Sequence, residues 1–205
     1  MSHIVSEQPV GYALQKRLMT AAEFLAWDET QTVKHEFVRG EVYMMTGGAD
    51  RNNTLAGNLY VALRNHLRGS PCRVYTSDVK LRVESADSYF YPDLMVTCSA
   101  ADAADRLIKR EPLLLVEVLS PSTAAFDRGD KFASYRQLPS LMEYLLVDVD
   151  ARRCDLFRKR KDDGLWVLHP SAAEQGVELS SVNLRIDGDT LWADLEPAAD
   201  APGAA

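Results

Sequence analysis

Two acidic residues lie inside segments that otherwise consist largely of apolar residues. Asp93 belongs to the segment 90–96, and Glu117 belongs to the segment 113–119. Short apolar segments rich in branched residues predict buried strands. A carboxylate buried in such a strand costs several kcal/mol unless a cation or a hydrogen-bond donor compensates its charge. If the two strands are neighbours, the two acids predict one shared cation, and a metal ion is the simplest candidate.

Length and composition predict one globular domain. The chain has 205 residues, of which 46% are hydrophobic, and this is enough for a substantial core. We predict a flexible N-terminal arm over residues 1–15, a single domain over 16–196 and a disordered tail over 197–205. No apolar run approaches the length of a membrane span, and no basic segment followed by an apolar stretch begins the chain. These features predict a cytoplasmic protein without a membrane partner.

The cysteines and the net charge narrow the class of protein. Cys72, Cys98 and Cys154 are odd in number, widely spaced and without a CxxC pair, so they predict reduced thiols rather than a zinc site or a disulfide. The formal net charge of −7 argues against a protein that coats DNA regardless of sequence, because such proteins are basic. Nucleic acid is not excluded, since an enzyme that holds a divalent cation carries surplus carboxylates.

The order of local patterns predicts an α/β fold. Thr20 and Glu23 form a capping box before a helix over 21–28, and Arg39-Gly40 predicts a tight hairpin within 35–45. Apolar residues at helical spacing predict a long helix over 52–67. The further elements that we expect are strands over 74–83, 89–97, 113–119 and 143–149, a helix over 123–137, a hairpin of 154–158 with 165–169, and a short strand over 184–186. This order favours a mixed sheet with helices on its faces over a regular doubly wound series.

The two acids suit a hard divalent cation. Mg²⁺ in proteins takes one or two carboxylates together with waters and substrate phosphates. Asp93, Glu117 and the carbonyl of Val118 would supply such a set of ligands. The alternative is that one or both acids lie at strand ends, where they are hydrogen-bonded and inert, and the spacing alone does not decide between the two interpretations.

A set of longer motifs resembles the Uma2 family, also called DUF820. The motifs are Tyr91-Pro92-Asp93, Val116-Glu117-Val118-Leu119-Ser120-Pro121-Ser122-Thr123, Asp127 with Lys131 and Tyr135, and Glu143-Tyr144 with Val147-Asp148. The stretch over residues 35–42 is similar to the opening hairpin of the family. The resemblance covers roughly residues 18–195, and the motif around Glu117 is its most specific part.

The resemblance implies a restriction-endonuclease-like α/β fold of the PD-(D/E)XK superfamily, in which a mixed central sheet is flanked by helices and accompanied by N-terminal and C-terminal hairpins. It also implies an endonuclease that uses Mg²⁺ or Mn²⁺, with Asp93 and Glu117 as the two acids of the motif. Leu119 occupies the place of the usual lysine. We favour Lys131 as its replacement, because the family carries a lysine on the following helix, and Lys80 on the preceding strand is the alternative. An ammonium is needed there because the transition state carries extra negative charge.

Three further residues are candidates for the site. Glu36 corresponds to a third acid that members of the superfamily often place on an N-terminal element, although its alternation with apolar neighbours also fits a surface strand. Asp78 lies on a strand that could flank Asp93. Arg51 stands where relatives often have a histidine, and an arginine there could contact a phosphate.

The sequence therefore predicts a metal-dependent endonuclease that hydrolyses phosphodiester bonds of nucleic acid, with DNA as the expected substrate. A homodimer is expected, because two sites are needed to cut both strands of a duplex. Two alternatives stay open: a non-cleaving module of the same fold that binds nucleic acid or a protein, and a hydrolase of small phosphate esters.

Overall fold

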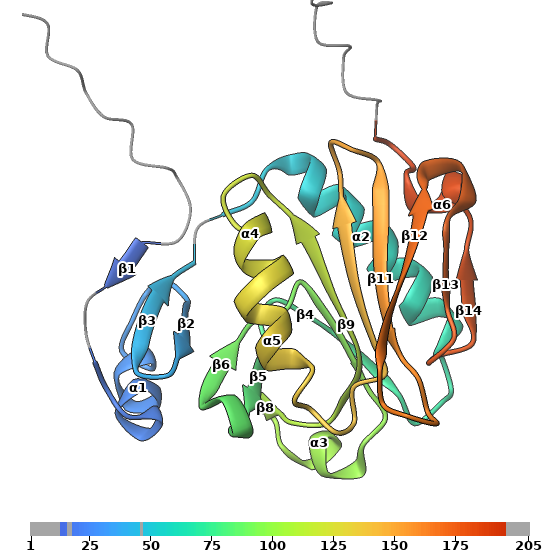
Figure 1. Ribbon diagram of the computed structural model, residues 1–205. Coiled ribbons are helices and arrows are strands. Elements are labelled where there is room, and N and C mark those ends of the chain that lie inside the picture. The colour runs from blue at the N-terminus through green and yellow to red at the C-terminus, as the bar shows by residue number, and fades with distance from the viewer. Residues whose placement is uncertain (1–12, 16–17, 46, 196–205) are drawn as a thin grey trace, which may run out of the picture.

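The computed structural model describes residues 13–15, 18–45 and 47–195, which form mixed sheets flanked by helices (Figure 1). The N-terminal sheet has the strand order β1 (Ala13–Gln15), β3 (Glu41–Met44), β2 (His35–Val38), β6 (Ser88–Phe90), β5 (Lys80–Val83) and β8 (Ile108–Lys109). The central sheet has the order β12 (Trp166–Ala172), β11 (Arg153–Lys159), β10 (Glu143–Asp148), β9 (Pro112–Leu119), β7 (Leu94–Thr97) and β4 (Arg73–Thr76). The predicted α/β fold class is confirmed, with the strands divided between two large sheets.

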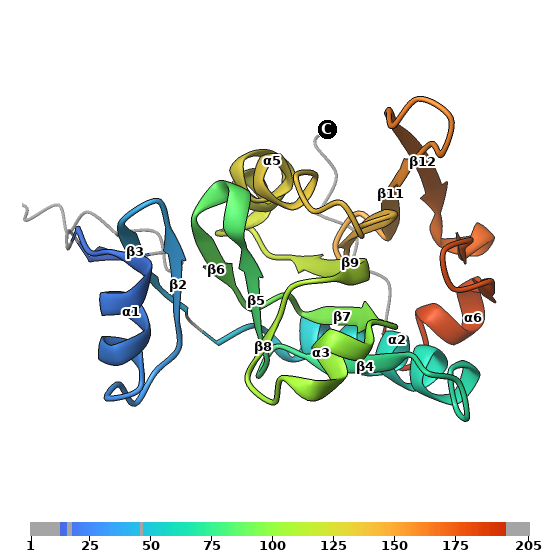
Figure 2. The same cartoon turned by 90° about the horizontal axis from the view of Figure 1, so that it is seen from below.

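The remaining elements complete the layers. A separate hairpin pairs β13 (Val177–Leu179) with β14 (Leu184–Ile186). The helices are α1 (Ala21–Asp28), α2 (Asp50–His66), α3 (Ala100–Ala104), α4 (Ala124–Phe126), the π-helical turn η2 (Asp127–Lys131), α5 (Phe132–Tyr135) and α6 (Gly188–Leu191), with short 3-10 turns η1 (Glu84–Ala86) and η3 (Ala173–Gln175). In Figure 2, α2 lies on one side of β7 and β9, and α5 lies on the other.

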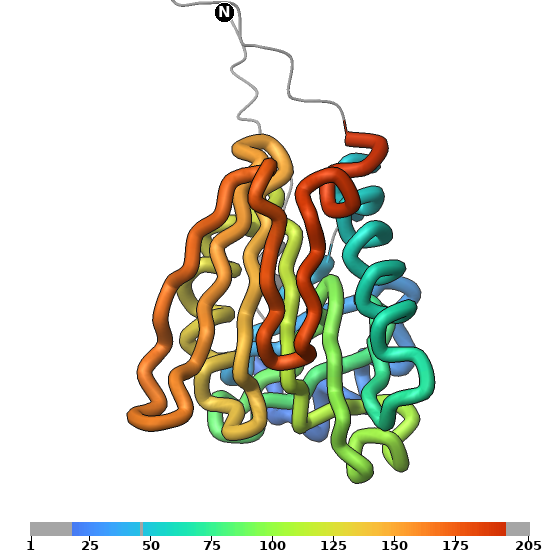
Figure 3. Tube along the Cα trace, turned by 90° about the vertical axis from the view of Figure 1, so that its right-hand side faces the viewer, coloured from blue at the N-terminus to red at the C-terminus, as the bar shows by residue number. Residues whose placement is uncertain are grey.

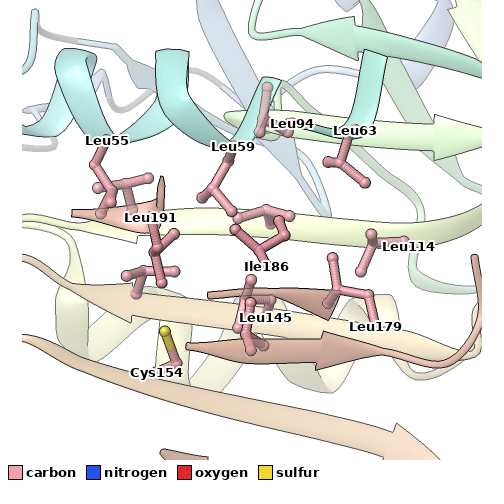
Figure 4. Close-up of a cluster of buried hydrophobic side chains, with 14 of the residues drawn as sticks. Leu55, Leu59, Leu63, Leu94, Leu114, Leu145, Cys154, Leu179, Ile186 and Leu191 are labelled. Carbon is pink, nitrogen blue, oxygen red and sulfur yellow. The ribbon is translucent and has the colours of Figure 1, made fainter. Parts of the chain in front are cut away.

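The main apolar core lies between α2, the central sheet and the C-terminal hairpin. Leu55, Leu59 and Leu63 of α2 are fully buried at the predicted helical spacing. Figure 4 shows them on the side of α2 that faces Leu114 of β9 and Leu145 of β10. The β13–β14 hairpin runs across the same face beside α2 (Figure 3). The opposite face of the central sheet carries the helical segment from α4 to α5, which leaves the end of β9.

Local sequence signals determine two elements of the N-terminal part. The hydroxyl of Thr20 accepts a hydrogen bond from the Glu23 N–H at 3.3 Å, and the Glu23 carboxylate accepts one from the Thr20 N–H at 2.7 Å. This is the predicted capping box of α1. The predicted hairpin joins β2 to β3 through Arg39 and Gly40, whose φ angles of 49° and 97° match the left-handed turn that a tight hairpin needs.

Two predicted strands are each broken in the structure. The segment 74–83 forms β4 in the central sheet and β5 in the N-terminal sheet, and the segment 89–97 forms β6 in the N-terminal sheet and β7 in the central sheet. In the second case Pro92 interrupts the strand, because proline has no N–H to donate to a neighbouring strand. Asp93 therefore lies at a crossing between the two sheets, just before β7, and not inside a strand as we expected.

The prediction that the cysteines are unpaired is wrong for two of them. Cys72 and Cys98 form a disulfide. The antiparallel pairing of β4 with β7 places Arg73 opposite Thr97, so the cysteines directly beyond this pair meet. Their sequence separation of 26 residues carries no sign of this contact. Cys154 is a free, buried thiol, and burial raises its pKa to about 12.

The division into arm, domain and tail stays a prediction. Residues 1–12 and 196–205, which contain most of the predicted arm and the predicted tail, lie outside the described residues, and the end of the arm forms β1 beside β3. Within the described part of the chain, no helix combines the length and the apolar character that crossing a membrane requires.

Candidate active site

Asp93 and Glu117 lie side by side because of the register between β7 and β9. Leu94 pairs with Val116 in this antiparallel pair, so the residue before Leu94 is next to the residue after Val116. The Val118 N–H donates to Oδ2 of Asp93 at 2.7 Å, and the Asp93 N–H donates to Oε2 of Glu117 at 3.4 Å. Each chain segment therefore contributes a carboxylate that is held by the backbone of the other.

Lys131 joins this pair to two further acids. Its Nζ lies 2.9 Å from Oε1 of Glu117, 3.3 Å from Oε1 of Glu36 and 3.4 Å from Oδ1 of Asp127. All four of these residues are buried. Ion pairs in such surroundings are screened little by solvent, so they hold the ammonium firmly beside Glu117.

The helical segment after β9 presents three polar side chains to the site. Asp127, Lys131 and Tyr135 recur at intervals of four residues, which places them on one helix face. Asp127 and Lys131 lie in the π-helical turn η2, a geometry that is often found at functional sites. The Tyr135 hydroxyl donates to Oε1 of Glu117 at 2.8 Å, and the Tyr144 hydroxyl donates to the backbone carbonyl of Asp127 at 3.1 Å.

Glu36 reaches the site from the N-terminal sheet. It lies on β2, is 0% exposed, and accepts a hydrogen bond at 3.0 Å from the Tyr91 N–H through Oε1. The interpretation of Glu36 as a surface strand residue is therefore wrong. The crossing at Tyr91-Pro92-Asp93 links the two sheets at this point, so acids from both sheets meet around Lys131.

The cluster carries more negative than positive charge. Glu36, Asp93, Glu117 and Asp127 surround one ammonium, that of Lys131. Burial raises the pKa of Asp93 and raises the pKa of Glu117 well above its ordinary value, and Lys131 opposes both shifts. A carboxylate whose ionisation is this unfavourable gains from a further cation.

The donor set is compatible with one hard cation. No three His, Cys, Asp or Glu side chains in the described ranges form a preassembled metal site. Mg²⁺, however, needs only one or two carboxylates together with waters, and Asp93 and Glu117 meet that requirement at the pocket surface. Val118 also lines the pocket, and its carbonyl oxygen lies 3.5 Å from Nδ2 of Asn52.

A pocket of about 720 Å³ opens beside these acids. Asp93, Glu117, Asp127 and Lys131 line one part of it. The other walls come from the segment 32–34, the glycines 47 and 48, one face of α2, and the turn at 76–77. The site is therefore open to a ligand, and its walls come from the central sheet, from helices and from segments next to strands of the N-terminal sheet.

The alternates that the sequence suggested lie elsewhere. Nζ of Lys80 lies 2.9 Å from Oδ2 of Asp28, and Asp78 is exposed and pairs with Lys34. Nη1 of Arg51 lies 2.8 Å from Oδ1 of Asp150. Lys80, Asp78 and Arg51 are not among the residues that line the pocket.

Sequence reasoning gave no role to Asp127 or Tyr135, although both belong to the motif that carried the family resemblance. The four-residue spacing with Lys131 was the signal that could have shown them on the same helix face. Asn52 was also missed: its Nδ2 donates to the Leu119 carbonyl at 2.8 Å and so ties α2 to the end of β9. No local pattern predicts that contact.

The chain matches a known protein family. Residues 21–187 match the sequence profile of Uma2, described as "Putative restriction endonuclease". The chain belongs to the Uma2 family. Two relatives from Synechocystis sp. are the uncharacterized protein slr1290, 37% identical over 86% of this chain and 93% of the relative, and the uncharacterized protein sll1609, 36% identical over 82% of this chain and 96% of the relative.

A solved structure has the same fold as this Uma2 protein. It is the crystal structure from Anabaena variabilis described as "a putative nuclease belonging to DUF820". The TM-score is 0.73 over 87% of this chain and 99% of that chain, at 13% sequence identity. At this identity the likeness supports the nuclease-like fold, and the roles of individual residues must be argued from the site itself.

Proposed function

We propose that this Uma2 protein is a metal-dependent endonuclease that hydrolyses phosphodiester bonds. Asp93 and Glu117, with the Val118 carbonyl, hold Mg²⁺ or Mn²⁺, Lys131 stabilises negative charge, and Glu36 assists. The observation that carries the proposal is the 2.9 Å ion pair between Lys131 and Glu117 beside Asp93, at the edge of an open pocket. This contact supports Lys131 as the ammonium of the proposed site, although position 119 is a leucine.

Each side chain has a distinct task in the proposed reaction. A divalent cation, when bound, lowers the pKa of a water molecule and neutralises charge on the phosphate. Lys131 provides a fixed positive charge that stabilises the extra negative charge of the transition state. Water forms a new bond to phosphorus and gives up a proton to solvent, the bond from phosphorus to the leaving sugar oxygen breaks, and that oxygen takes up a proton from solvent. Glu36 keeps Lys131 in place and adds negative charge that favours the cation.

The substrate and the setting form part of the same proposal. Nucleic acid, and DNA in particular, is the substrate that the family description supports. A homodimer would bring two sites to one duplex. We also propose the cytoplasm as the location.

A nuclease assay on the purified chain tests the proposal. Plasmid, single-stranded DNA and RNA are incubated with Mg²⁺, with Mn²⁺ or with EDTA, and p-nitrophenyl phosphate tests for a hydrolase of small esters. We expect cleavage of polynucleotide with either metal and none with EDTA. Asp93→Asn should abolish it, whereas Asp78→Asn, at an exposed acid outside the pocket, should not.

A non-cleaving binder of the same fold is the second candidate, because Leu119 replaces the lysine of the motif. Its signature would be binding of nucleic acid without cleavage under any metal condition. Cleavage that persists unchanged in Asp93→Asn would indicate a contaminating nuclease and would remove the support for the proposed site.

A further inference from the structure

The wall of the pocket formed by α2 has a composition that the proposed chemistry does not explain. Asn53, Gly57 and Tyr60 line the pocket at helical spacing, so they form one stripe on this helix. The stripe combines an exposed amide, a position without a side chain and an aromatic ring. None of these groups belongs to the carboxylate cluster around Lys131.

Gly57 has no evident structural reason to be glycine. It lies in the interior of α2, where glycine weakens a helix. Its φ is not positive, and a methyl group at this position would meet no atom within 4 Å other than those of its chain neighbours and its own helix backbone. Neither backbone conformation nor packing therefore requires glycine. Its effect is to leave open space on the pocket side of α2, three residues before Tyr60.

The charges of the pocket do not suit a rigid duplex. Duplex binding draws on several lysine or arginine contacts to phosphates. The lining residues include no arginine, and their two lysines, Lys34 and Lys131, both form ion pairs with acids. Three lining carboxylates, those of Asp93, Glu117 and Asp127, outnumber these lysines.

Single-stranded nucleic acid is recognised in a different way. Phosphate contacts still contribute, but the unpaired bases also stack on aromatic side chains, and this adds binding energy that a duplex with stacked, paired bases cannot gain in the same way. The pocket volume of about 720 Å³ falls within the range of about 300–1,000 Å³ typical of small-ligand sites. A pocket of this size accepts an unpaired nucleotide, whereas a paired base would first have to leave its duplex.

We infer that the pocket binds a single-stranded segment, with the base beside the scissile phosphate stacked on Tyr60 over the open space at Gly57 and the amide of Asn53 in reach of its edge. This inference deepens the proposed nuclease function and rests on it for the position of the scissile phosphate. The substrate class is thereby an unpaired polynucleotide strand, such as a single-stranded stretch or an end.

Binding is measured separately from cleavage. The probe is a fluorescein-labelled, mixed-sequence DNA of about 12 nucleotides, within the size range of single-strand sites, with a phosphorothioate backbone that resists cleavage. Its anisotropy is followed with the full chain in Mg²⁺, as a single strand and as a duplex. The variants are Tyr60→Leu, which keeps apolar bulk without a ring, Tyr60→Phe, which keeps the ring, and Gly57→Leu, which fills the open space.

The matched control is Val61→Ala. Val61 is the neighbour of Tyr60 on α2, is 55% exposed and does not line the pocket. Thermal melting of every variant establishes that it is folded, and leucine at position 57 should favour the helix. A loss of binding in a folded variant is then a property of the pocket wall.

We expect the single strand to bind about 10-fold tighter than the duplex, and Tyr60→Leu and Gly57→Leu each to weaken it by about 10-fold. Tyr60→Phe and Val61→Ala should stay within about 2-fold of the wild type.

Equal or tighter duplex binding, no binding of either probe, or unchanged binding in Tyr60→Leu would each overturn the inference. Metal-dependent cleavage of an unmodified strand that is unaffected by Tyr60→Leu would leave the nuclease proposal intact and remove this one. Single-strand binding with the expected pattern but without cleavage would support the single-strand inference and remove the nuclease proposal.

Discussion

The ammonium of Lys131 lies 2.9 Å from Oε1 of Glu117, and the hydroxyl of Tyr135 donates to the same oxygen at 2.8 Å. Two donors from one helix face thus hold one oxygen of this carboxylate. The other oxygen, Oε2, faces Asp93 and accepts its N–H at 3.4 Å. The helix after β9 therefore orients Glu117 so that its second oxygen lies on the side of Asp93, where the proposed metal site is.

Replacing Lys131 by methionine should lower turnover far more than it lowers metal affinity, because the ammonium stabilises the transition state and does not ligate the ion. The variant should also lose about 3–5 kcal/mol of unfolding free energy, since buried acids are left without their cation. Cleavage rates across a Mg²⁺ titration and urea unfolding measure the two effects. The control is Lys80→Met, which breaks the 2.9 Å pair with Asp28 and removes a lysine that does not line the pocket. Loss of cleavage in the control and not in Lys131→Met would mean that Lys80, and not Lys131, supplies the ammonium of the site.

Asp93→Asn should remove the stabilisation of the protein by metal. An ion that binds only the folded state adds about 2.7 kcal/mol at a concentration 100 times its Kd, so Mg²⁺ or Mn²⁺ should raise the Tm of the wild type and not of the variant. Without metal, the variant should be as stable as the wild type or more stable, because one of several close negative charges is gone. Differential scanning fluorimetry with EDTA and with each metal tests this, with Asp78→Asn as the exposed control. Equal shifts in wild type and Asp93→Asn would mean that the ion binds elsewhere.

The raised pKa values of Asp93 and Glu117 predict an opposite pH dependence with and without metal. Both groups bind protons more tightly in the folded chain than in the unfolded one, so their contribution to stability is present at low pH. It is lost as the pH rises from their ordinary pKa values through the raised ones. In EDTA, the stability of the wild type relative to Asp93→Asn should therefore fall as the pH rises above the ordinary pKa of an aspartate, about 4. In saturating Mg²⁺ this difference should rise instead, because metal binding needs the ionised acids. Urea unfolding at each pH gives the difference, and a flat profile in both conditions would contradict the prediction.

Tyr135→Phe should weaken the orientation of Glu117 without removing any charge. Burial, with Glu117 as a further cause, raises the pKa of Tyr135 well above its usual range, so the hydroxyl stays protonated and donates at all working pH values. Its loss should cost about 1–3 kcal/mol of stability and lower turnover by a smaller factor than Lys131→Met does. Tyr144→Phe is the matched control, because Tyr144 donates to the Asp127 backbone carbonyl and not to Glu117. If both variants are destabilised equally and their turnover falls by the same factor, the Tyr135 hydroxyl does not orient Glu117 for the reaction.

The sequence alone determined the features that depend on neighbouring residues. The capping box of Thr20 and Glu23, the left-handed turn at Arg39-Gly40 and the apolar stripe of α2 each lie within one short segment. Their conformations follow from local hydrogen bonds, backbone preferences and helical periodicity. The motifs around Asp93 and Glu117 likewise indicated the family, because the residues within each motif are close together along the chain.

Only the tertiary structure decided which distant segments meet. The crossing at Pro92, which moves the chain from the N-terminal sheet to the central sheet, brings Glu36 next to Lys131 and places Asp93 outside its expected strand. The antiparallel pairing of β4 with β7 brings Cys72 to Cys98. The partner of a strand is chosen by hydrogen bonds and packing between residues far apart in sequence, and no local pattern records that choice. The residue types therefore predicted the chemistry of the candidate site, and the fold decided its geometry.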